Sequence, residues 1–418
     1  MALDPSSPIE VHGRKYALPK CPTVVVCVDG FDPEYLDQGI SDGILPNMGR
    51  FVQTESFAVT AKCAMPSFTN PNNLSIITGA PTAAHGIAGN FFLDKETKQE
   101  FMCLDDSLLR GTTILKELSE RGVRVAAVTA KDKLRKIIGH GLKAANGAIC
   151  FSSEKASACS VAEHGVGDVE AWIGRPTPSQ YSGDLSLFVL DAGVKILEEQ
   201  RADFLYLTLS DFVQHHHAPG SREANDFYDA LDVRIGRLAD LGALVAITGD
   251  HGMSDKADVH GQPNILFLQD RLEEKWGKGS ARIICPITDP FVKHHGALGS
   301  FVRVHLEDST QANDVLRFCQ GLAEVEIALL GHVAAETFEM PLDREADLVV
   351  IAKKNAVIGS TAAEHDLSSI SGHRLRSHGG LSEQAIPLIL SGPVKNKDLP
   401  TDGWRNFDAF HLVLNEAA

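Results

Sequence analysis

Four short apolar runs in this sequence, rich in Val, Ile, Leu and Ala, are each followed closely by a charged residue. Continuous apolar runs of this length are typical of parallel strands that helices cover on both faces. Ligands of such sheets bind at the carboxyl ends of the strands. We therefore predict an α/β fold whose mostly parallel central sheet carries a functional site along one edge. The runs are residues 23–28, 123–130, 204–209 and 244–248, and the charged residues that follow are Asp29, Lys131, Asp211 and Asp250.

Helical patterns separate these strands, and the longest has a clear apolar face. At 223–241 the residues Phe227, Leu231, Ile235 and Leu238 recur at helical spacing, which is typical of a helix packed against a core. The sequence thus favours helices flanking the central sheet. The predicted helices are 45–52, 69–78, 113–121, 185–200 and 223–241.

The segment 261–370 differs from the rest of the chain. It contains short strands and helices without the repeated charged endings, and after it the first pattern returns with a strand at 385–390. We therefore predict a catalytic core made of residues 1–260 and 371–418. Residues 261–370 are expected to form an inserted, smaller α+β cap domain.

Composition excludes several classes of function. The 418 residues are 44% apolar and 22% charged, as in ordinary globular proteins, and no apolar run approaches the length of a membrane span. A formal charge of −16 argues against a nucleic-acid-binding or anionic-membrane surface. Residues 1–20 lack the apolar stretch of a signal peptide, and the eight cysteines are scattered. We therefore expect a cytoplasmic protein; the oligomeric state stays open, with a homodimer as one option.

Thr69 is the candidate nucleophile. We expect it to act as the N-cap of the helix at 69–78, because Thr caps helices well and the Pro71 that follows is tolerated in a first turn. A hydroxyl at this point would lie beside free backbone N–H groups and the positive end of the helix dipole, which attract phosphate-like anions. A Thr hydroxyl needs a base or a metal to remove its proton.

Carboxylates and imidazoles at the strand ends could supply that metal. Asp29 or Asp211 alone could be an ordinary turn or helix cap, and a lone His378 would be weak evidence. However, His215 lies one helical turn after Asp211, and two ligand-type residues are adjacent at 250–251. Together these residues predict two metal sites. Asp and His donors suit Zn²⁺, with Mn²⁺ or Fe²⁺ as alternatives.

Seven short motifs place the chain in a family. In order and residue type they resemble the alkaline phosphatase superfamily, in particular its nucleotide pyrophosphatase/phosphodiesterase-like branch and, within that branch, the phosphonoacetate hydrolases. Two further cues for the last group are the segments 128–133 and 287–300. The motifs are Val-Asp-Gly-Phe at 28–31, Thr-Asn-Pro-Asn at 69–72, Ile-Thr-Gly at 77–79, His-Gly-Ile at 85–87, Asp211-x-x-x-His215, Gly-Asp-His-Gly-Met at 249–253 and Ser-His-Gly at 377–379.

The resemblance implies an alkaline-phosphatase-like core and a role for each matching residue. It implies that Thr69 is both nucleophile and metal ligand, and that Asn90 donates to a phosphoryl oxygen. We also count His215 among the residues that contact the substrate. Related diesterases have Thr-Phe-Pro-Asn-His where this chain has Thr-Asn-Pro-Asn-Asn at 69–73, which weakens a diesterase assignment. One zinc would be held by Asp211, His215 and His378, and the second by Asp29, Asp250 and His251.

Cleavage of a carbon–phosphorus bond requires cations near the leaving carbon. Phosphonoacetate eases the departure of carbon because its carboxylate spreads the developing charge, and positive groups stabilise that charge. Lys131 and Lys133 follow a strand on the same edge as the candidate metal ligands, and alternate residues of an extended chain face one side. We expect both lysines to bind the carboxylate. The alternative is that they are solvated surface lysines.

Other interpretations stay open. A phosphodiesterase or nucleotide pyrophosphatase of the same superfamily is the main enzymatic alternative, and a phosphoryl mutase is a third. A catalytically dead anion-binding protein on the same fold is the non-enzymatic one. In the cap, the residues Thr288, Asp289, Lys293, His294 and His295 could close over a small anionic phosphonate or form an ordinary packed loop.

Overall fold

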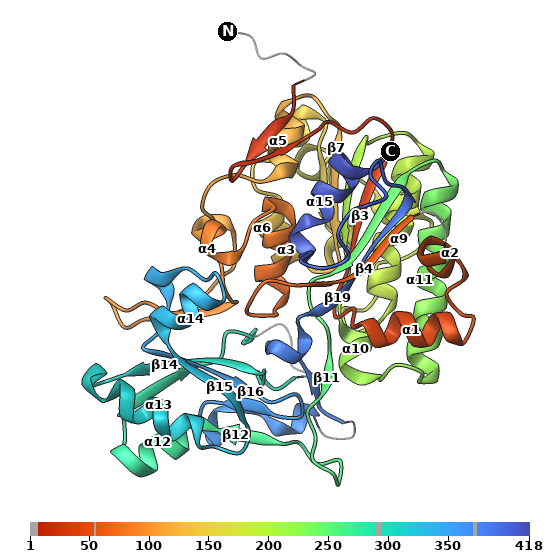
Figure 1. The fold of residues 1–418 in the computed structure, drawn as a ribbon. Helices are drawn as coiled ribbons and strands as arrows, with labels where there is room; N and C mark the ends of the chain where they lie inside the picture. The colour runs from red at the N-terminus through yellow and green to blue at the C-terminus, as the bar shows by residue number, and fades with distance from the viewer. Residues whose placement is uncertain (1–6, 54–55, 290–294, 371–373) are drawn as a thin grey trace.

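The computed structural model describes residues 7–53, 56–289, 295–370 and 374–418, and its largest element is a seven-stranded sheet (Figure 1). The strand order is β4-β19-β10-β3-β9-β7-β8. In this order, the neighbouring strands from β10 to β8 are parallel to each other, whereas β19 is antiparallel to both β10 and β4. The predicted α/β class is therefore confirmed. The strands are β3 (Thr23–Val28), β4 (Ser56–Lys62), β7 (Val125–Thr129), β8 (Ile149–Ser152), β9 (Phe204–Thr208), β10 (Leu244–Gly249) and β19 (Ala385–Pro393).

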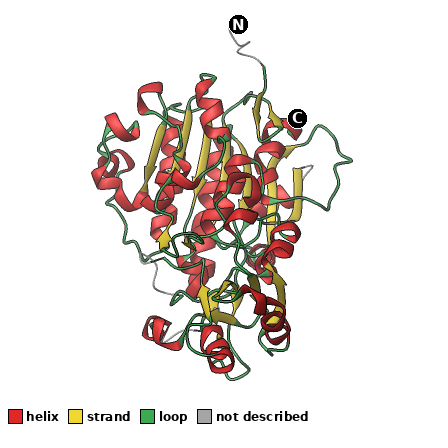
Figure 2. Cartoon of the chain, turned by 90° about the vertical axis from the view of Figure 1, so that its left-hand side faces the viewer, coloured by secondary structure: helices red, strands yellow, loops and turns green. Residues whose placement is uncertain are grey.

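Both faces of this sheet are covered by helices (Figure 2). Alternate residues of β3 enter opposite cores: Val24 and Val26 pack in one cluster, and Val25 and Cys27 in the other. This explains why the strand is apolar at every position after Thr23. One face carries α1 (Pro33–Ser41), α2 (Pro46–Gln53), α9 (Asp184–Glu198) and α11 (Arg222–Asp240). The other carries α3 (Thr69–Thr78), α5 (Ile114–Glu120), α6 (Asp132–Ile138) and α15 (Ala409–His411).

A second, antiparallel sheet of four strands lies below the first in Figure 1, in the order β13-β14-β16-β15. Its core includes Met65 and Phe68, which immediately precede α3. The second sheet falls within the segment expected to be a cap, although the domain boundaries stay a prediction. Its elements are β13 (Ala281–Ile284), β14 (Phe301–Leu306), β15 (Val325–Leu330), β16 (Leu348–Ala352), α12 (Leu268–Trp276), α13 (Ala312–Gln320) and α14 (Gly331–Thr337).

Short elements connect these layers. Strand β11 pairs with β18, which brings the residues before His378 back to the core. Within the residues described above, no helix is both long and apolar enough to cross a membrane. The connecting elements are β1 (Ile9–Val11), β2 (Arg14–Tyr16), β5 (Phe91–Leu93), β6 (Glu100–Met102), β11 (Ser254–Asp255), β12 (Ile265–Phe267), β17 (Val357–Gly359), β18 (Arg376–Ser377), α4 (Thr82–His85), α7 (Val161–His164), α8 (Val169–Ile173) and α10 (Phe212–His216).

A buried ion pair joins the second sheet to the loop that carries Asn90. Arg303 binds Glu345 through two contacts of 2.6 and 3.1 Å, and it donates to the Ala88 carbonyl at 3.1 Å. Both side chains are at most 2% exposed, so removing one partner leaves a buried, uncompensated charge.

We expect Arg303→Met to lower the free energy of unfolding by about 3–5 kcal/mol, measured by urea denaturation. Arg317→Met is the matched control, because Arg317 is an exposed residue of α13 that pairs with an exposed Asp314; its change should stay within about 0.5 kcal/mol. Equal effects of the two substitutions would contradict the role of the buried pair.

Candidate active site

The charged residues that follow four neighbouring strands lie at one edge of the central sheet. Asp250, Asp29, Asp211 and Lys131 come after β10, β3, β9 and β7, which are adjacent in this order. All three aspartates are at most 4% exposed. Gly30 makes the turn after Asp29 with a φ of 69°, and its N–H donates to Asp250 Oδ1 at 3.2 Å. The predicted collection of charge at this edge is therefore present.

The first candidate metal cluster consists of Asp211, His215 and His378. Asp211 Oδ2 lies 2.9 Å from His215 Nε2 and 3.7 Å from His378 Nε2. His215 is on α10, one turn after Asp211, and its backbone N–H donates to the Asp211 carbonyl. The three ligand-type atoms lie within 4.8 Å of one another, which is close enough for them to surround one ion.

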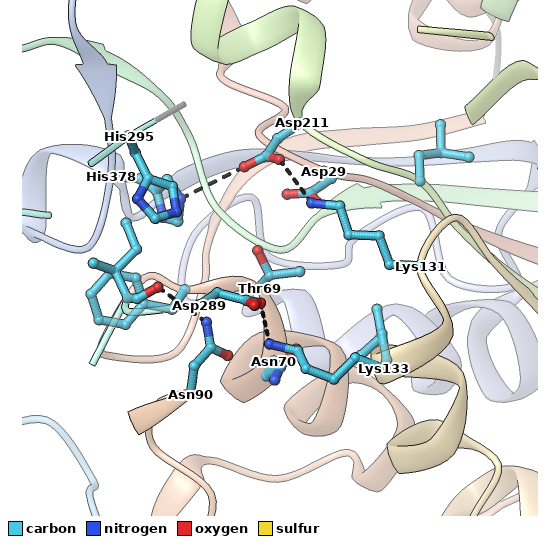
Figure 3. Close-up of a pocket in the computed structure, with 14 residues that line it drawn as sticks. Asp29, Thr69, Asn70, Asn90, Lys131, Lys133, Asp211, Asp289, His295 and His378 are labelled. Atoms are coloured by element: carbon cyan, nitrogen blue, oxygen red, sulfur yellow. Dashed lines mark hydrogen bonds and ion pairs between the residues drawn. The ribbon is translucent and has the colours of Figure 1, made fainter. Parts of the chain in front are cut away.

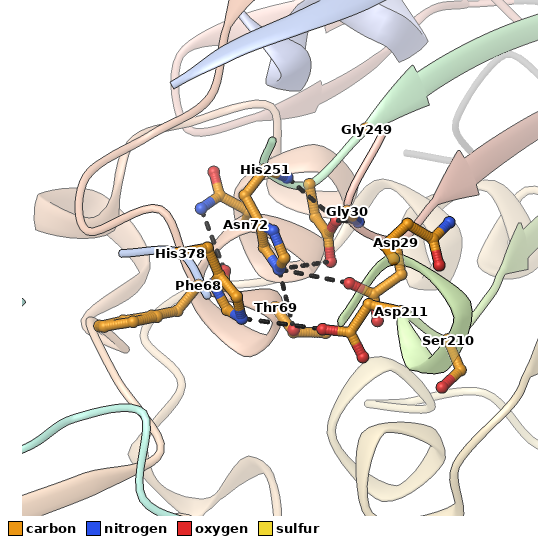
Figure 4. A network of polar contacts seen from close by, with 12 residues as sticks. Asp29, Gly30, Phe68, Thr69, Asn72, Ser210, Asp211, Gly249, His251 and His378 are labelled. Atoms are coloured by element: carbon orange, nitrogen blue, oxygen red, sulfur yellow. Dashed lines mark hydrogen bonds and ion pairs between the residues drawn. The ribbon is translucent and has the colours of Figure 1, made fainter. Parts of the chain in front are cut away.

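The second candidate cluster consists of Asp29, Asp250 and His251, again with ligand-type atoms within 4.8 Å of one another. His251 Nε2 lies 3.3 Å from Asp29 Oδ1 and 3.9 Å from Asp250 Oδ2. The rings of His251 and His378 stack with centroids 3.6 Å apart, so the two clusters adjoin (Figure 4). These are the two groups that the family resemblance implies, and their role as ligands stays a prediction.

The three histidines share one orientation. Nδ1 faces a backbone carbonyl in each: Arg376 O at 2.7 Å from His215, Ser67 O at 2.8 Å from His378, and Gly252 O at 2.9 Å from His251. A carbonyl can only accept, so Nδ1 carries a proton in each ring, and Nε2 is the atom that faces the carboxylates. Imidazoles that bind metals are commonly fixed in this way.

Burial makes the charge of these clusters unfavourable without a cation. Burial and the nearby Asp211 raise the pKa of Asp29, and burial and Asp29 raise the pKa of Asp250. Burial lowers the pKa of His251, but Asp250 and Asp29 together raise it to about 10. Burial and the neighbouring His251 hold the pKa of His378 well below its usual range. Buried carboxylates and imidazoles form a donor set that fits divalent cations such as Zn²⁺, whose charge would compensate the aspartates in place of a proton.

Thr69 lies next to both clusters but is not the N-cap of α3. The cap position belongs to Phe68, whose backbone is extended and which makes no side-chain cap bond, and Thr69 is the first helical residue. The expectation of an N-cap was therefore wrong by one residue. Because Thr69 is not the cap, its hydroxyl does not accept a hydrogen bond from the first turn of α3. Its Oγ1 instead lies 3.3 Å from His251 Nε2, as a nucleophile beside the candidate metal clusters should.

Asn73 is a site residue that the sequence interpretation missed. Its Nδ2 donates to Asp250 Oδ2 at 3.2 Å and to the Thr69 carbonyl at 3.0 Å. Tyr206 and Thr208 on β9 both donate to its Oδ1 at 2.7 Å. Asn73 therefore holds Asp250 in place, and its position one helical turn after Thr69 was the available signal.

A small cavity of about 40 Å³ opens in front of Thr69. Both predicted lysines line it (Figure 3), with side chains 23% and 12% exposed, so neither is a solvated surface lysine. Lys131 Nζ is 3.9 Å from Asp211 Oδ1, and Lys133 forms an ion pair with Asp289. The expected geometry was wrong, because Lys131 is the N-cap of α6 and Lys133 lies in its first turn rather than on an extended strand.

Asn90 and two cap residues complete the lining. Asn90 Nδ2 donates to the Ile287 carbonyl at 3.4 Å, and its buried Oδ1 has no hydrogen-bond partner in the part of the chain that the structure describes. Asp289 and His295 also line the cavity, while closure of this segment over a substrate stays a prediction. Burial lowers the pKa of His295 to about 3, with a further contribution from His215. Lys293 and His294, named with them above, lie outside the described residues.

Known proteins resemble this chain over most of its length. A model of the type I phosphodiesterase / nucleotide pyrophosphatase family matches residues 23–377. Crystal structures of phosphonoacetate hydrolase from Sinorhizobium meliloti 1021, with phosphonoacetate and with phosphonoformate, are each 44% identical to the chain. Each alignment covers 99% of this chain and all of that one, with a TM-score of 0.94.

Two further comparisons are narrower. Phosphonoacetate hydrolase from Penicillium oxalicum is 56% identical over 41 residues, which are 9% of this chain and 57% of that sequence. This chain therefore spans little more than half of that relative. Murine ectonucleotide pyrophosphatase / phosphodiesterase 5 is 16% identical, with a TM-score of 0.63 and 96% of each chain covered, which is a similarity of fold.

Proposed function

Since the chain belongs to the type I phosphodiesterase / nucleotide pyrophosphatase family, we propose that it is a phosphonoacetate hydrolase, which cleaves the carbon–phosphorus bond to give acetate and phosphate. The observation that carries the proposal is the 44% identity, over nearly the whole chain, to the Sinorhizobium meliloti enzyme whose structure holds phosphonoacetate. The cavity supports it, because two lysines line the same small space as Thr69.

Two zinc ions would be held by the two clusters, with manganese or iron as alternatives. Asp211, His215 and His378 would hold one ion, and Asp29, Asp250 and His251 the other, with Thr69 Oγ1 as an additional ligand. When bound, such cations favour the deprotonated Thr69 hydroxyl and neutralise the charge of the phosphonate.

Thr69 then begins a double displacement. Its Oγ1 attacks phosphorus, the new Oγ1–P bond forms and the P–C bond breaks, and the bonding electron pair leaves with the acetate carbon, which takes up a proton. Water next attacks the phosphothreonine, the Oγ1–P bond breaks, and phosphate leaves with Thr69 regenerated. Asn90 would donate to a phosphoryl oxygen after its amide turns its N–H groups into the cavity, and His215 would border the phosphoryl group.

Lys131 and Lys133 would bind the substrate carboxylate. The charge that develops on the leaving group spreads into this carboxylate, so ammonium groups here stabilise the transition state more than the ground state. Asp289, paired with Lys133, keeps that ammonium in the cavity wall before substrate binds. The two ammonium groups in the lining of this small cavity suit the negative charge of a carboxylated phosphonate.

An assay of phosphate release tests the proposal directly. The purified protein, loaded with Zn²⁺, is given phosphonoacetate, phosphonopyruvate, aminoethylphosphonate or a nitrophenyl ester. We expect phosphonoacetate to be the best substrate by kcat/KM. A preference for a nitrophenyl diester would instead support the phosphodiesterase alternative. Bound zinc without turnover of any of these compounds would support an anion-binding protein.

We expect Lys131→Met to lower kcat/KM for phosphonoacetate by about 10- to 150-fold, because one hydrogen bond to a charged group is lost. Activity on a nitrophenyl ester without a carboxylate should change much less. Lys136→Met is the matched control, since Lys136 lies one turn further along α6 with its side chain 54% exposed. A parallel loss on both substrates would show that Lys131 does not recognise the carboxylate.

A further inference from the structure

Asn70, the residue after Thr69, carries a buried amide that the protein itself does not use. The side chain is 3% exposed and lines the cavity in front of Thr69. Its Nδ2 has no hydrogen-bond partner anywhere in the described part of the chain. Buried amide donors are almost always paired, and an unpaired one lowers stability. Such a donor in a cavity wall indicates a partner that arrives with a ligand.

The other two asparagines of the same helix show the contrast. Asn72 Nδ2 donates to the carbonyls of Ala64, Pro66 and Phe68, each at 3.1 Å. Asn73 is bonded at both its amide nitrogen and its oxygen, as described above. Asn72 and Asn73 therefore use their amides to bind neighbouring parts of the chain. The Nδ2 of Asn70 lines the cavity and binds no group in the described part of the chain.

The position of Asn70 indicates which end of a substrate it would meet. In Figure 3, Asp29, Asp211 and the ammonium of Lys131 lie on one side of Thr69, and Asn70 and Lys133 lie on the other. The phosphoryl group must lie between Thr69 and the metal-binding side for attack to occur. The part of the substrate that extends away from the metal-binding side therefore comes to Asn70.

We propose that Asn70 Nδ2–H donates a hydrogen bond to the carboxylate of the substrate and, together with Lys133 on the same side of Thr69, selects short carboxylated phosphonates. This inference rests on the proposed function and deepens it by adding a neutral donor to the carboxylate site. An amide donor recognises the carboxylate by direction as well as by charge, and it leaves the net charge of the site unchanged.

Kinetics of Asn70→Ala and of the isosteric Asn70→Asp test the proposal. We expect Asn70→Ala to lower kcat/KM for phosphonoacetate by about 10- to 100-fold and to leave that for a nitrophenyl ester without a carboxylate nearly unchanged. Asn70→Asp should lose more, because its carboxylate repels that of the substrate. Neither effect should appear in Asn313→Ala, a matched control at an exposed residue of α13.

Thermal unfolding separates substrate contact from structural support. Because Nδ2 bonds to no described residue, Asn70→Ala should unfold at the temperature of the wild type or above it. A lowered unfolding temperature with equal losses on both substrates would overturn the proposal, and so would an unchanged kcat/KM for phosphonoacetate.

Binding measurements keep this inference separate from the proposed function. Calorimetry on Thr69→Val, with and without Asn70→Ala, compares phosphonoacetate with inorganic phosphate. Weaker binding of phosphonoacetate alone in the double variant supports the Asn70 contact, even if the wild type releases no phosphate and the proposed function fails. Equal affinities of single and double variants for phosphonoacetate would reject the contact, even if the wild type is fully active.

Discussion

Replacing Thr69 by valine is expected to lower phosphate release from phosphonoacetate by at least about 10³-fold, as removal of a nucleophile does in other hydrolases. Valine keeps the shape of threonine and has a methyl group in place of the hydroxyl, which lies 3.3 Å from His251 Nε2 at the first residue of a buried helix. Without that oxygen no phosphothreonine can form. Single-turnover kinetics with phosphonoacetate measure this step directly.

The control for this prediction is Thr69→Ser, which keeps a hydroxyl at the same position. We expect it to retain measurable turnover and to carry a phosphoryl group on the introduced serine when the reaction is quenched in acid. Both variants should bind zinc. If Thr69→Val instead kept more than about a tenth of the wild-type rate, a direct attack of water on phosphorus would replace the two-step mechanism.

The parts of the fold that were predicted correctly depend on local patterns. The apolar run at 23–28 became β3 with the same limits, because its side chains from Val24 to Val28 alternate between two cores. Phe227, Leu231, Ile235 and Leu238 of α11 are all buried, as their spacing predicted. Because β10, β3 and β9 are parallel neighbours, their carboxyl ends bring Asp250, Asp29 and Asp211 to one edge of the sheet. This could be anticipated from the apolar runs together with the rule that parallel α/β sheets bind ligands at that edge.

The details that were wrong or missed depend on where helices begin and on distant contacts. The start of α3 differs from the prediction by one residue. Phe68 takes the cap position because its backbone is extended and its side chain packs in the core of the second sheet. Lys131 and Lys133 were assigned to an extended segment because the start of α6 has no side-chain cap signal. The unpaired amide of Asn70 can be recognised only from the structure, because it depends on the positions of all the polar groups around it.

Removal of the metal should abolish activity and lower stability together. Asp29 and Asp250 are buried together in the second cluster, and Asp211 of the first cluster lies close enough to raise the pKa of Asp29, so a bound cation would relieve their mutual repulsion. Ions that bind only the folded state add about 3–4 kcal/mol to the free energy of unfolding when free metal exceeds Kd by 100- to 1,000-fold. We therefore expect a chelator to lower the unfolding temperature and stop phosphate release, and added Zn²⁺ to restore both.

Metal analysis of ligand variants then tests whether there are two sites. Wild type should hold about two zinc ions per chain, whereas His378→Ala and Asp250→Asn, one from each cluster, should each hold about one and lose at least about 10²-fold in kcat. His217→Ala is the matched control near His215, since that side chain faces Glu223 at the surface. Two ions retained in His378→Ala would contradict its role as a ligand. A single ion in the wild type would reduce the catalytic centre to one cluster and leave the other as a network of hydrogen bonds.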